Sequence, residues 1–291
     1  MRLLLGLLLP AAVAATVTVT PFCKNSVRVQ ITPSDADSDE DYKQQAAVLA
    51  QTLAEKELKE LPGALIDTCG PGEPVALAEA APVKNGNIQV ASTADGLTVT
   101  AVDTGKTLFT AKTTFSPTSH LVPPGFKAID FSMTAGDKDE RIYGLGQGNW
   151  TGPAGCATGV PQVVVPLERN GQTVELLQRK FHVTIPFAYS TAGYGVVFNM
   201  PGYGHVVVGA KGEGGMDWKA DAALGLDVWI TAGSTPGAVY EQYADATGHA
   251  PPLRENAMIF WQSRNRYMSS DIALGVAQHY QKLKLPVGVI V

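Results

Sequence analysis

Short runs of alternating apolar and polar residues follow one another along most of the chain, and Gly-rich or Pro-rich turns separate them. Alternation places every second side chain on one face of a strand, so each run predicts a strand with one buried face. Many such strands in succession favour an antiparallel β-sandwich. The predicted strands cover 17–31, 88–90, 97–102, 129–133, 163–167, 173–177, 181–187, 194–199, 205–208 and 226–230.

The composition agrees with a strand-rich globular protein. The 291 residues include 30 Gly and 19 Pro, which interrupt helices, and 45% hydrophobic residues, which suffice for a sizeable core. The formal net charge of −5 comes without basic clusters, so no nucleic-acid partner is expected. No run of residues is long and apolar enough to predict a membrane span.

The first fifteen residues have the organisation of a secretory signal peptide. Arg2 precedes the apolar run 3–9, and small residues such as Ala12 and Ala14 follow it. The run is too short to anchor the chain in a bilayer. We therefore expect residues 1–15 to be a signal peptide, and the protein to be secreted or held in a vacuole or the endoplasmic reticulum lumen. A buried first strand or helix is the alternative.

Three cysteines, Cys23, Cys69 and Cys156, remain in the expected mature chain. An oxidising compartment permits one disulfide among them, and the sequence alone does not choose among the three pairings. No Cys or His residues have the spacing of metal ligands, so neither a metal site nor a cofactor is expected. Asn149 begins a glycosylation sequon.

An acidic stretch at 34–41 precedes apolar residues at Tyr42, Ala46, Leu49 and Leu53. These spacings of three and four predict one apolar helix face, and carboxylates at a helix start suit the helix dipole. We expect a helical insertion near 38–61. A calcium loop is the alternative for the acidic stretch, but the central Gly and the closing Glu of such a loop are missing.

A second helix is predicted after residue 234. Thr235 suits its N-cap, Pro236 its first turn and Gly248 its end. Val239, Tyr243 and Ala246 would then face the core. A Pro-containing connector at 248–253 follows this helix, and it marks a boundary between a sandwich domain at 16–252 and a second domain at 253–291.

The last forty residues follow another plan. The apolar runs 257–261 and 287–291 predict two strands buried on both faces. Between them, Ser269 or Ser270 caps a helix whose apolar stripe is formed by Ile272, Val276, Tyr280 and Leu283, and Pro286 ends it. Strand, helix and strand form a βαβ unit with parallel pairing. Because two such strands leave apolar faces uncovered, we expect the parent fold to continue into a barrel.

Several segments resemble glycoside hydrolase family 31 in sequence, order and spacing. They are IYGLGQ at 142–147, RNGQTV at 169–174, the IPF and GYGVVFN runs within 185–199, the Gly-Ser-Thr-Pro helix start at 233–236, APP at 250–252, FWQSRNRY at 260–267 and LPVGVIV at 285–291. The resemblance implies a galactose mutarotase-like β-sandwich followed by the first βαβ unit of an incomplete (β/α)8 barrel.

The resemblance also implies a retaining α-glycosidase of α-glucosidase or α-xylosidase type. Retention uses two carboxyl groups about 5–5.5 Å apart, one as nucleophile and one as acid/base. In the family both belong to later barrel strands, which would lie beyond Val291, so no residue of this chain is predicted to be catalytic. We expect an α-linked oligosaccharide or glycoside as substrate, and an inactive 291-residue chain.

The predicted substrate contacts follow the first barrel strand. The resemblance places Asn265 near the sugar ring, with Arg264 and Tyr267 as its neighbours. Trp261 offers a ring for sugar stacking, with core packing as the alternative. The loop at 148–170 reaches toward the leaving-group subsite in one interpretation and is a plain connector in the other.

Three further carboxylates, Asp217, Asp227 and Asp245, are interpreted as exposed turn or helix residues without a catalytic role. A rival function is also retained: a noncatalytic carbohydrate-binding β-sandwich module, or the product of a decayed gene.

Overall fold

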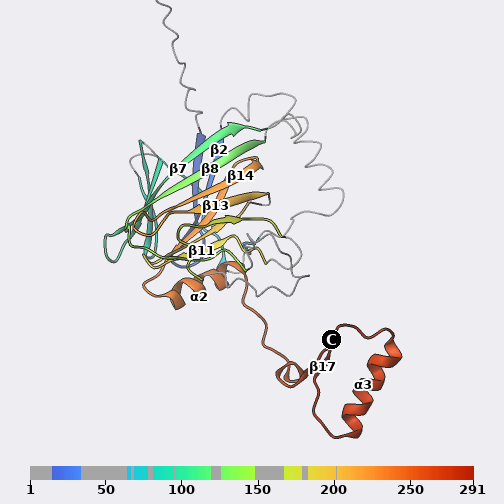
Figure 1. Ribbon diagram of the computed structural model, residues 1–291. Coiled ribbons are helices and arrows are strands. Elements are labelled where there is room, and N and C mark those ends of the chain that lie inside the picture. Colours follow the sequence, from blue (N-terminus) through green and yellow to red (C-terminus); the bar gives the residue numbers. More distant parts are fainter. Residues whose placement is uncertain are drawn as a thin grey trace, which may run out of the picture. The chain divides into compact units, whose positions relative to one another are not determined.

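The computed structural model describes residues 15–33, 64–66, 69–77, 81–94, 96–118, 126–147, 167–178, 183–200 and 202–291 (Figure 1). It divides into two compact units, a first unit of Met1–Gly248 and a second unit of His249–Val291. Almost all of the signal-peptide prediction, the helical insertion near 38–61, Asn149, Cys156, most of the strand 163–167 and most of the loop 148–170 lie outside the described residues.

The first sheet has seven strands, and all its neighbours pair antiparallel. They are β1 (Ala15–Pro21), β2 (Ser26–Pro33), β3 (Val75–Ala76), β9 (Ile142–Gly144), β11 (Phe187–Ser190), β12 (Tyr194–Phe198) and β15 (Leu226–Ala232). The spatial order is β3-β1-β2-β15-β12-β11-β9, so β9 lies at an edge.

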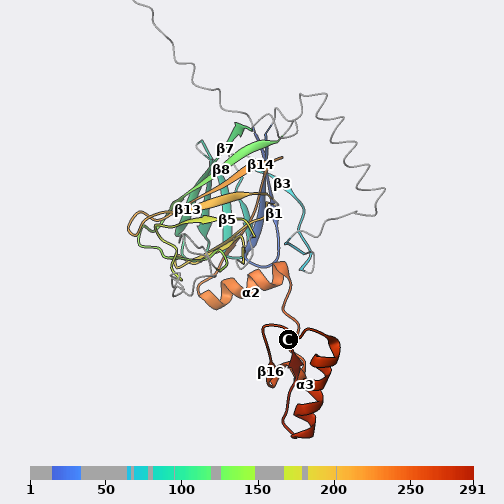
Figure 2. The same cartoon turned by 45° about the vertical axis from the view of Figure 1, so that its right-hand side comes forward.

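The second sheet has eight strands, again with antiparallel neighbours. They are β4 (Val83–Asn85), β5 (Ile88–Thr93), β6 (Gly96–Ala101), β7 (Thr107–Pro117), β8 (Lys127–Ala135), β10 (Thr173–Glu175), β13 (Gly204–Val208) and β14 (Met216–Ala223). Their order in the sheet is β10-β13-β14-β8-β7-β6-β5-β4. Figure 2 shows the two sheets from a second direction.

The two sheets share one hydrophobic core. Trp218 of β14 meets Phe198 of β12 with ring centroids 5.2 Å apart, and Phe109 of β7 meets Tyr194 of β12 at 4.9 Å. All four side chains are fully or almost fully buried between the sheets. Burial of such rings contributes about 1.5–3 kcal/mol each relative to exposure, which makes this interior the main source of stability. The predicted mainly β fold with large antiparallel sheets is confirmed.

Helix α2 (Pro236–Thr247) packs on β12 and β15, on the face of the first sheet that points away from the shared core. As predicted, Thr235 caps it, with its hydroxyl accepting the Ala238 N–H at 3.2 Å, and Gly248 ends it with a φ of 99°. Val239 and Ala246 are buried, as expected. Gly195 permits the close approach, because a Cβ there would lie 2.7 Å from the Val239 side chain.

Two predicted strands differ from the structure. The range 17–31 is a hairpin rather than one strand, since Cys23 and Asn25 adopt positive φ angles of 61° and 56° in a turn between β1 and β2. The range 181–187 includes residues outside the described part, and its strand β11 begins only at Phe187. Pro186, directly before it, has no N–H to donate to a neighbouring strand.

The second unit contains the 3₁₀ turn η4 (Glu255–Met258), β16 (Trp261–Gln262), helix α3 (Ser270–Lys282) and β17 (Val289–Ile290). β16 and β17 pair in parallel, with Trp261 opposite Val289, so the predicted βαβ order is confirmed. Ser269 is the cap, its hydroxyl accepting the Ile272 N–H at 3.3 Å. The helix ends before Pro286, because Lys284 turns the chain with a φ of 55°.

The predicted burial of these two strands is wrong within this structure. Within the run 257–261, Ala257 and Met258 belong to the 3₁₀ turn and only Trp261 belongs to a strand; Phe260 and Trp261 keep 52% and 53% of their surface exposed. On α3, Ile272 and Leu283 are exposed, while Val276 and Tyr280 are half-buried. Two strands and one helix provide too little apolar surface to cover both faces of a parallel pair.

Among the described helices, none combines the length and hydropathy that crossing a membrane needs.

Candidate functional site: the segment after the first parallel strand

The four predicted substrate contacts lie on one segment of the second unit, from β16 to the start of α3. Arg264 and Asn265 are exposed on the connection after the strand. Trp261 is half exposed, and its indole N–H donates to the Ala257 carbonyl at 3.0 Å. That bond fixes the edge of the ring, and about half of the residue's surface stays exposed. Their role in substrate binding stays a prediction.

Gln262 organises this segment, although the sequence did not single it out. The Tyr280 hydroxyl of α3 donates to Gln262 Oε1 at 2.5 Å, and Gln262 Nε2 donates to the Tyr267 hydroxyl at 3.3 Å. Gln262 therefore ties the strand, the connection and the helix together. A polar residue between an apolar run and a polar loop was the available signal, but only the fold reveals its partners.

Two of the three carboxylates interpreted as exposed turn or helix residues lie on strands instead. Asp227 of β15 accepts two bonds from Arg28, at 2.9 and 2.6 Å, and one from Asn199 at 2.9 Å. Asp217 of β14 accepts from the Ser132 hydroxyl. These partners give both carboxylates a role in cross-strand pairing. Asp245 lies on α2, as expected.

Two segments that carry the family resemblance meet in the first unit. Arg169 donates its backbone N–H to the Ile142 carbonyl at 2.7 Å, and its guanidinium donates to the carbonyls of Gly144 at 3.1 Å and Gly146 at 2.7 Å. Gly144, Leu145 and Gly146 all have positive φ angles, of 102°, 63° and 80°.

The Arg169 side chain thus holds a sharp turn by donating to two of its backbone carbonyls. Arg169 is only 5% exposed, and burial lowers the pKa of its guanidinium. The charge persists, because an arginine is effectively always protonated in proteins. The short Gly-Leu-Gly motif therefore has a structural explanation in its backbone geometry and in its bonds to a buried cation.

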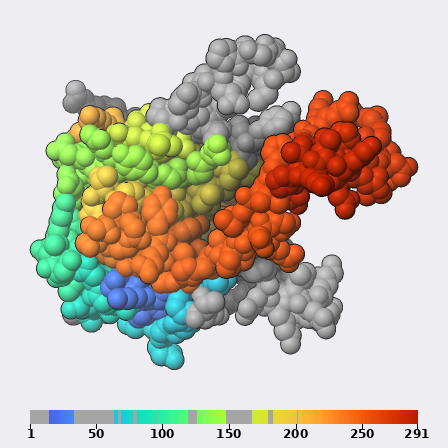
Figure 3. Space-filling view, turned by 90° about the horizontal axis from the view of Figure 1, so that it is seen from below, coloured from blue at the N-terminus to red at the C-terminus, as the bar shows by residue number. Residues whose placement is uncertain are grey.

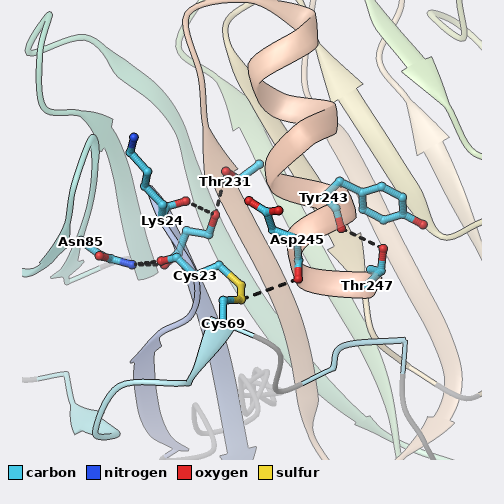
Figure 4. Close-up of a disulfide and its surroundings, with 9 residues drawn as sticks. Cys23, Lys24, Cys69, Asn85, Thr231, Tyr243, Asp245 and Thr247 are labelled. Carbon is cyan, nitrogen blue, oxygen red and sulfur yellow. Dashed lines mark hydrogen bonds between the residues drawn. A yellow bond between two sulfur atoms is a disulfide. The ribbon is translucent and has the colours of Figure 1, made fainter. Parts of the chain in front are cut away.

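The disulfide joins Cys23 and Cys69, which settles the pairing that the sequence left open. Their Cα atoms are 5.2 Å apart, within the usual range. Figure 4 shows the bridge from Cys23 in the β1–β2 turn to Cys69, which lies close to the C-terminal part of α2. Asn85 donates to the Cys23 carbonyl at 2.6 Å. Ile66, close to Cys69 in sequence, donates its N–H to the Ala246 carbonyl of α2 at 2.8 Å. The bridge therefore ties Cys69 to the β1–β2 turn, while Ile66 bonds to the helix.

Curated proteins resemble the chain over somewhat more than half of its length. No protein-family model matches it. It is 32% identical over 154 residues to an uncharacterized family 31 glucosidase of Pseudescherichia vulneris, covering 52% of this chain and 26% of that protein. It is 30% identical over 165 residues to an α-xylosidase of Saccharolobus solfataricus, covering 56% of this chain and 21% of that protein. The chain thus spans about a quarter of these relatives.

Solved structures match the fold of this chain over nearly its whole length. A family 31 α-xylosidase from a soil metagenome, complexed with xylose, matches with a TM-score of 0.69 and 27% identity, covering 96% of this chain and 39% of that one. A xylosidase from Aspergillus niger matches with a TM-score of 0.70 and 19% identity, covering 95% and 37%, which bears on the fold alone.

Two large antiparallel sheets followed by a parallel βαβ unit define a mainly β protein of the architecture found in these xylosidases. The chain is a homologue of the α-xylosidases and glucosidases of glycoside hydrolase family 31 over the part that it matches.

Proposed function

We propose that the protein carrying this sequence is a retaining α-glycoside hydrolase of α-xylosidase or α-glucosidase type. The observation that carries the proposal is the match of 96% of the chain, across both units, to a family 31 α-xylosidase complexed with xylose. The proposed substrate is an α-linked oligosaccharide or glycoside. The 291 residues contribute the sandwich and the start of the barrel domain.

The nucleophile and the acid/base belong, in this proposal, to barrel strands that the 291 residues do not include. Active sites of such barrels lie at the C-terminal ends of the strands. The connection after β16 occupies that position, which supports a substrate-facing role for Arg264, Asn265 and Tyr267. Asn265 would lie nearest the sugar, and the half-exposed ring of Trp261 would contact its C–H groups. Gln262 would hold the connection after β16 in place through its hydrogen bonds with Tyr280 and Tyr267.

The activity test compares two proteins, the purified 291-residue chain and the product of its natural transcript extended through the barrel. Each is mixed with the p-nitrophenyl α-glycosides of xylose and glucose. We expect release of p-nitrophenol by the extended protein alone, because hydrolysis with retention needs both carboxyl groups. Turnover by the 291-residue chain that an active-site-directed inhibitor abolishes would contradict the assignment of the acids to later strands.

We also propose that residues 1–15 direct the protein into the secretory pathway. The Cys23–Cys69 disulfide supports this proposal, since disulfides persist in oxidising compartments. The measurement is N-terminal sequencing of the protein from its natural source. The expected mature N-terminus lies close to Thr16, and an intact Met1 on the folded, disulfide-bonded protein would refute the proposal.

A further inference from the structure

Five aromatic side chains gather where α2 crosses the edge of the first sheet. Phe187 and Tyr189 come from β11, Tyr143 from β9, and Tyr240 and Tyr243 from α2. The ring centroids of Tyr240 lie 5.5 Å from Phe187 and 6.0 Å from Tyr189, and Tyr189 lies 6.3 Å from Tyr143. We call these five residues the aromatic cluster.

The base of the aromatic cluster is rigid. Phe187 is 3% exposed and stacks on Tyr243 with centroids 4.2 Å apart and an interplanar angle of 20°. Gly195 lies beneath it, because a Cβ at that position would come within 2.9 Å of the Phe187 ring. Tyr240 therefore rests on a fixed surface, and binding there would cost little ordering of side chains.

The aromatic cluster also opens to solvent. Tyr240 is 46% exposed and Tyr143 is half-buried, while Tyr189 lies beneath them at 8%. Figure 3 shows the surface of the first unit on the side where α2, in orange, lies. Burial raises the pKa of Tyr189, and the neighbouring phenols of Tyr240 and Tyr143 raise it further. The rings of Tyr240 and Tyr143 flank that of Tyr189, with centroids 6.0 and 6.3 Å from it.

The chemistry of the aromatic cluster suits one ligand class. All five side chains are neutral, so they offer no ion pair to a charged ligand. A purely apolar partner would bury phenol hydroxyls without giving them hydrogen bonds, which is costly. A pyranoside presents apolar C–H groups on one ring face and hydroxyl groups around its rim, and it complements both features.

We propose that the aromatic cluster is a binding site for a neutral α-linked oligosaccharide. One sugar ring packs on Tyr240, and its hydroxyl groups bond to the phenols of Tyr189 and Tyr143. All five residues belong to the first unit, so the site goes beyond the proposed hydrolysis and requires no barrel residue. It also favours the carbohydrate-binding role retained above as a rival function.

The test uses the 291-residue chain and maltotriose, with binding followed by saturation-transfer NMR and titration calorimetry. We expect the wild-type chain to bind. Tyr240→Ala should weaken binding by about tenfold, which corresponds to a loss of about 1.4 kcal/mol. Tyr240→Phe should retain most of the affinity, because it keeps the ring. Circular dichroism of each variant checks that the fold is unchanged.

Tyr203→Ala is the matched control, because Tyr203 is 44% exposed and outside the aromatic cluster. It should bind as the wild type does. The proposal is overturned if the wild-type chain does not bind maltotriose at millimolar concentration, or if folded Tyr240→Ala binds as well as the wild type. Neither measurement involves turnover, so either failure leaves the hydrolase proposal standing.

Discussion

Replacing Cys23 by Ser lowers the free energy of unfolding of the first unit by about 4 kcal/mol, which is the chain-entropy estimate for a loop of this length. The bridge joins residues separated by 46 positions, so its loss frees a long segment in the unfolded chain. It also releases Cys69 from the β1–β2 turn, near the place where Ile66 bonds to Ala246 of α2. Urea denaturation of the oxidised proteins, followed by tryptophan fluorescence, measures the change.

Cys156→Ser is the matched control for this substitution, since Cys156 is not part of the Cys23–Cys69 bridge. We expect its denaturation midpoint to equal that of the wild type, and a dithiol reductant to bring all three proteins to one midpoint. If oxidised Cys23→Ser unfolds at the wild-type midpoint, the bridge contributes nothing and the account of this region is wrong.

Replacing Glu140 by Ala should cost about 2–6 kcal/mol of stability, because two buried donors lose their acceptor and each unsatisfied donor costs about 1–3 kcal/mol. Glu140 is 2% exposed. Its carboxyl oxygens accept hydrogen bonds from the Gly215 N–H at 2.8 Å and from the Ser190 hydroxyl. Gly215 directly precedes β14 of the second sheet, and Ser190 ends β11 of the first sheet, so Glu140 links the two sheets. The substitution leaves both buried donors without that acceptor. Thermal unfolding and urea titration at neutral pH report the loss.

Glu213→Ala is the control for Glu140, since Glu213 is exposed in the turn just before Gly215. It removes the same charge from the same region and should change stability by less than about 0.5 kcal/mol, as surface substitutions do. Equal destabilisation by both substitutions would show that net charge, and not the cross-sheet contact, governs the effect.

Features set by local chemistry were predictable from the sequence. The α2 helix begins and ends as expected, because both signals are local. The Thr235 hydroxyl accepts a backbone N–H three residues on, and Gly248 adopts the positive φ that ends the helix. The βαβ order of the last forty residues also followed from local patterns. The two strands were nevertheless expected to be buried, since periodicity reports an apolar run and not what covers it.

Features set by contacts between distant segments were not predictable. Cys23 pairs with Cys69 because a turn at Cys23–Asn25 faces the segment beside α2, and that turn uses left-handed residues other than Gly. The roles of Arg169 and Gln262 depend in the same way on neighbours that only the fold supplies. For the candidate site, the resemblance indicated the segment 261–267, but the residue that holds it together was missed.

The parallel pairing of β16 with β17 is the feature that sets the proposed start of a barrel apart from an isolated sandwich. Nuclear Overhauser measurements on isotope-labelled protein test it directly. We predict contacts between Trp261 and Val289 and between Gln262 and Ile290, with the Val291 amide protected by its bond to the Gln262 carbonyl. Cross-strand contacts in antiparallel register, or none between these two segments, would contradict the assignment of the chain to this architecture.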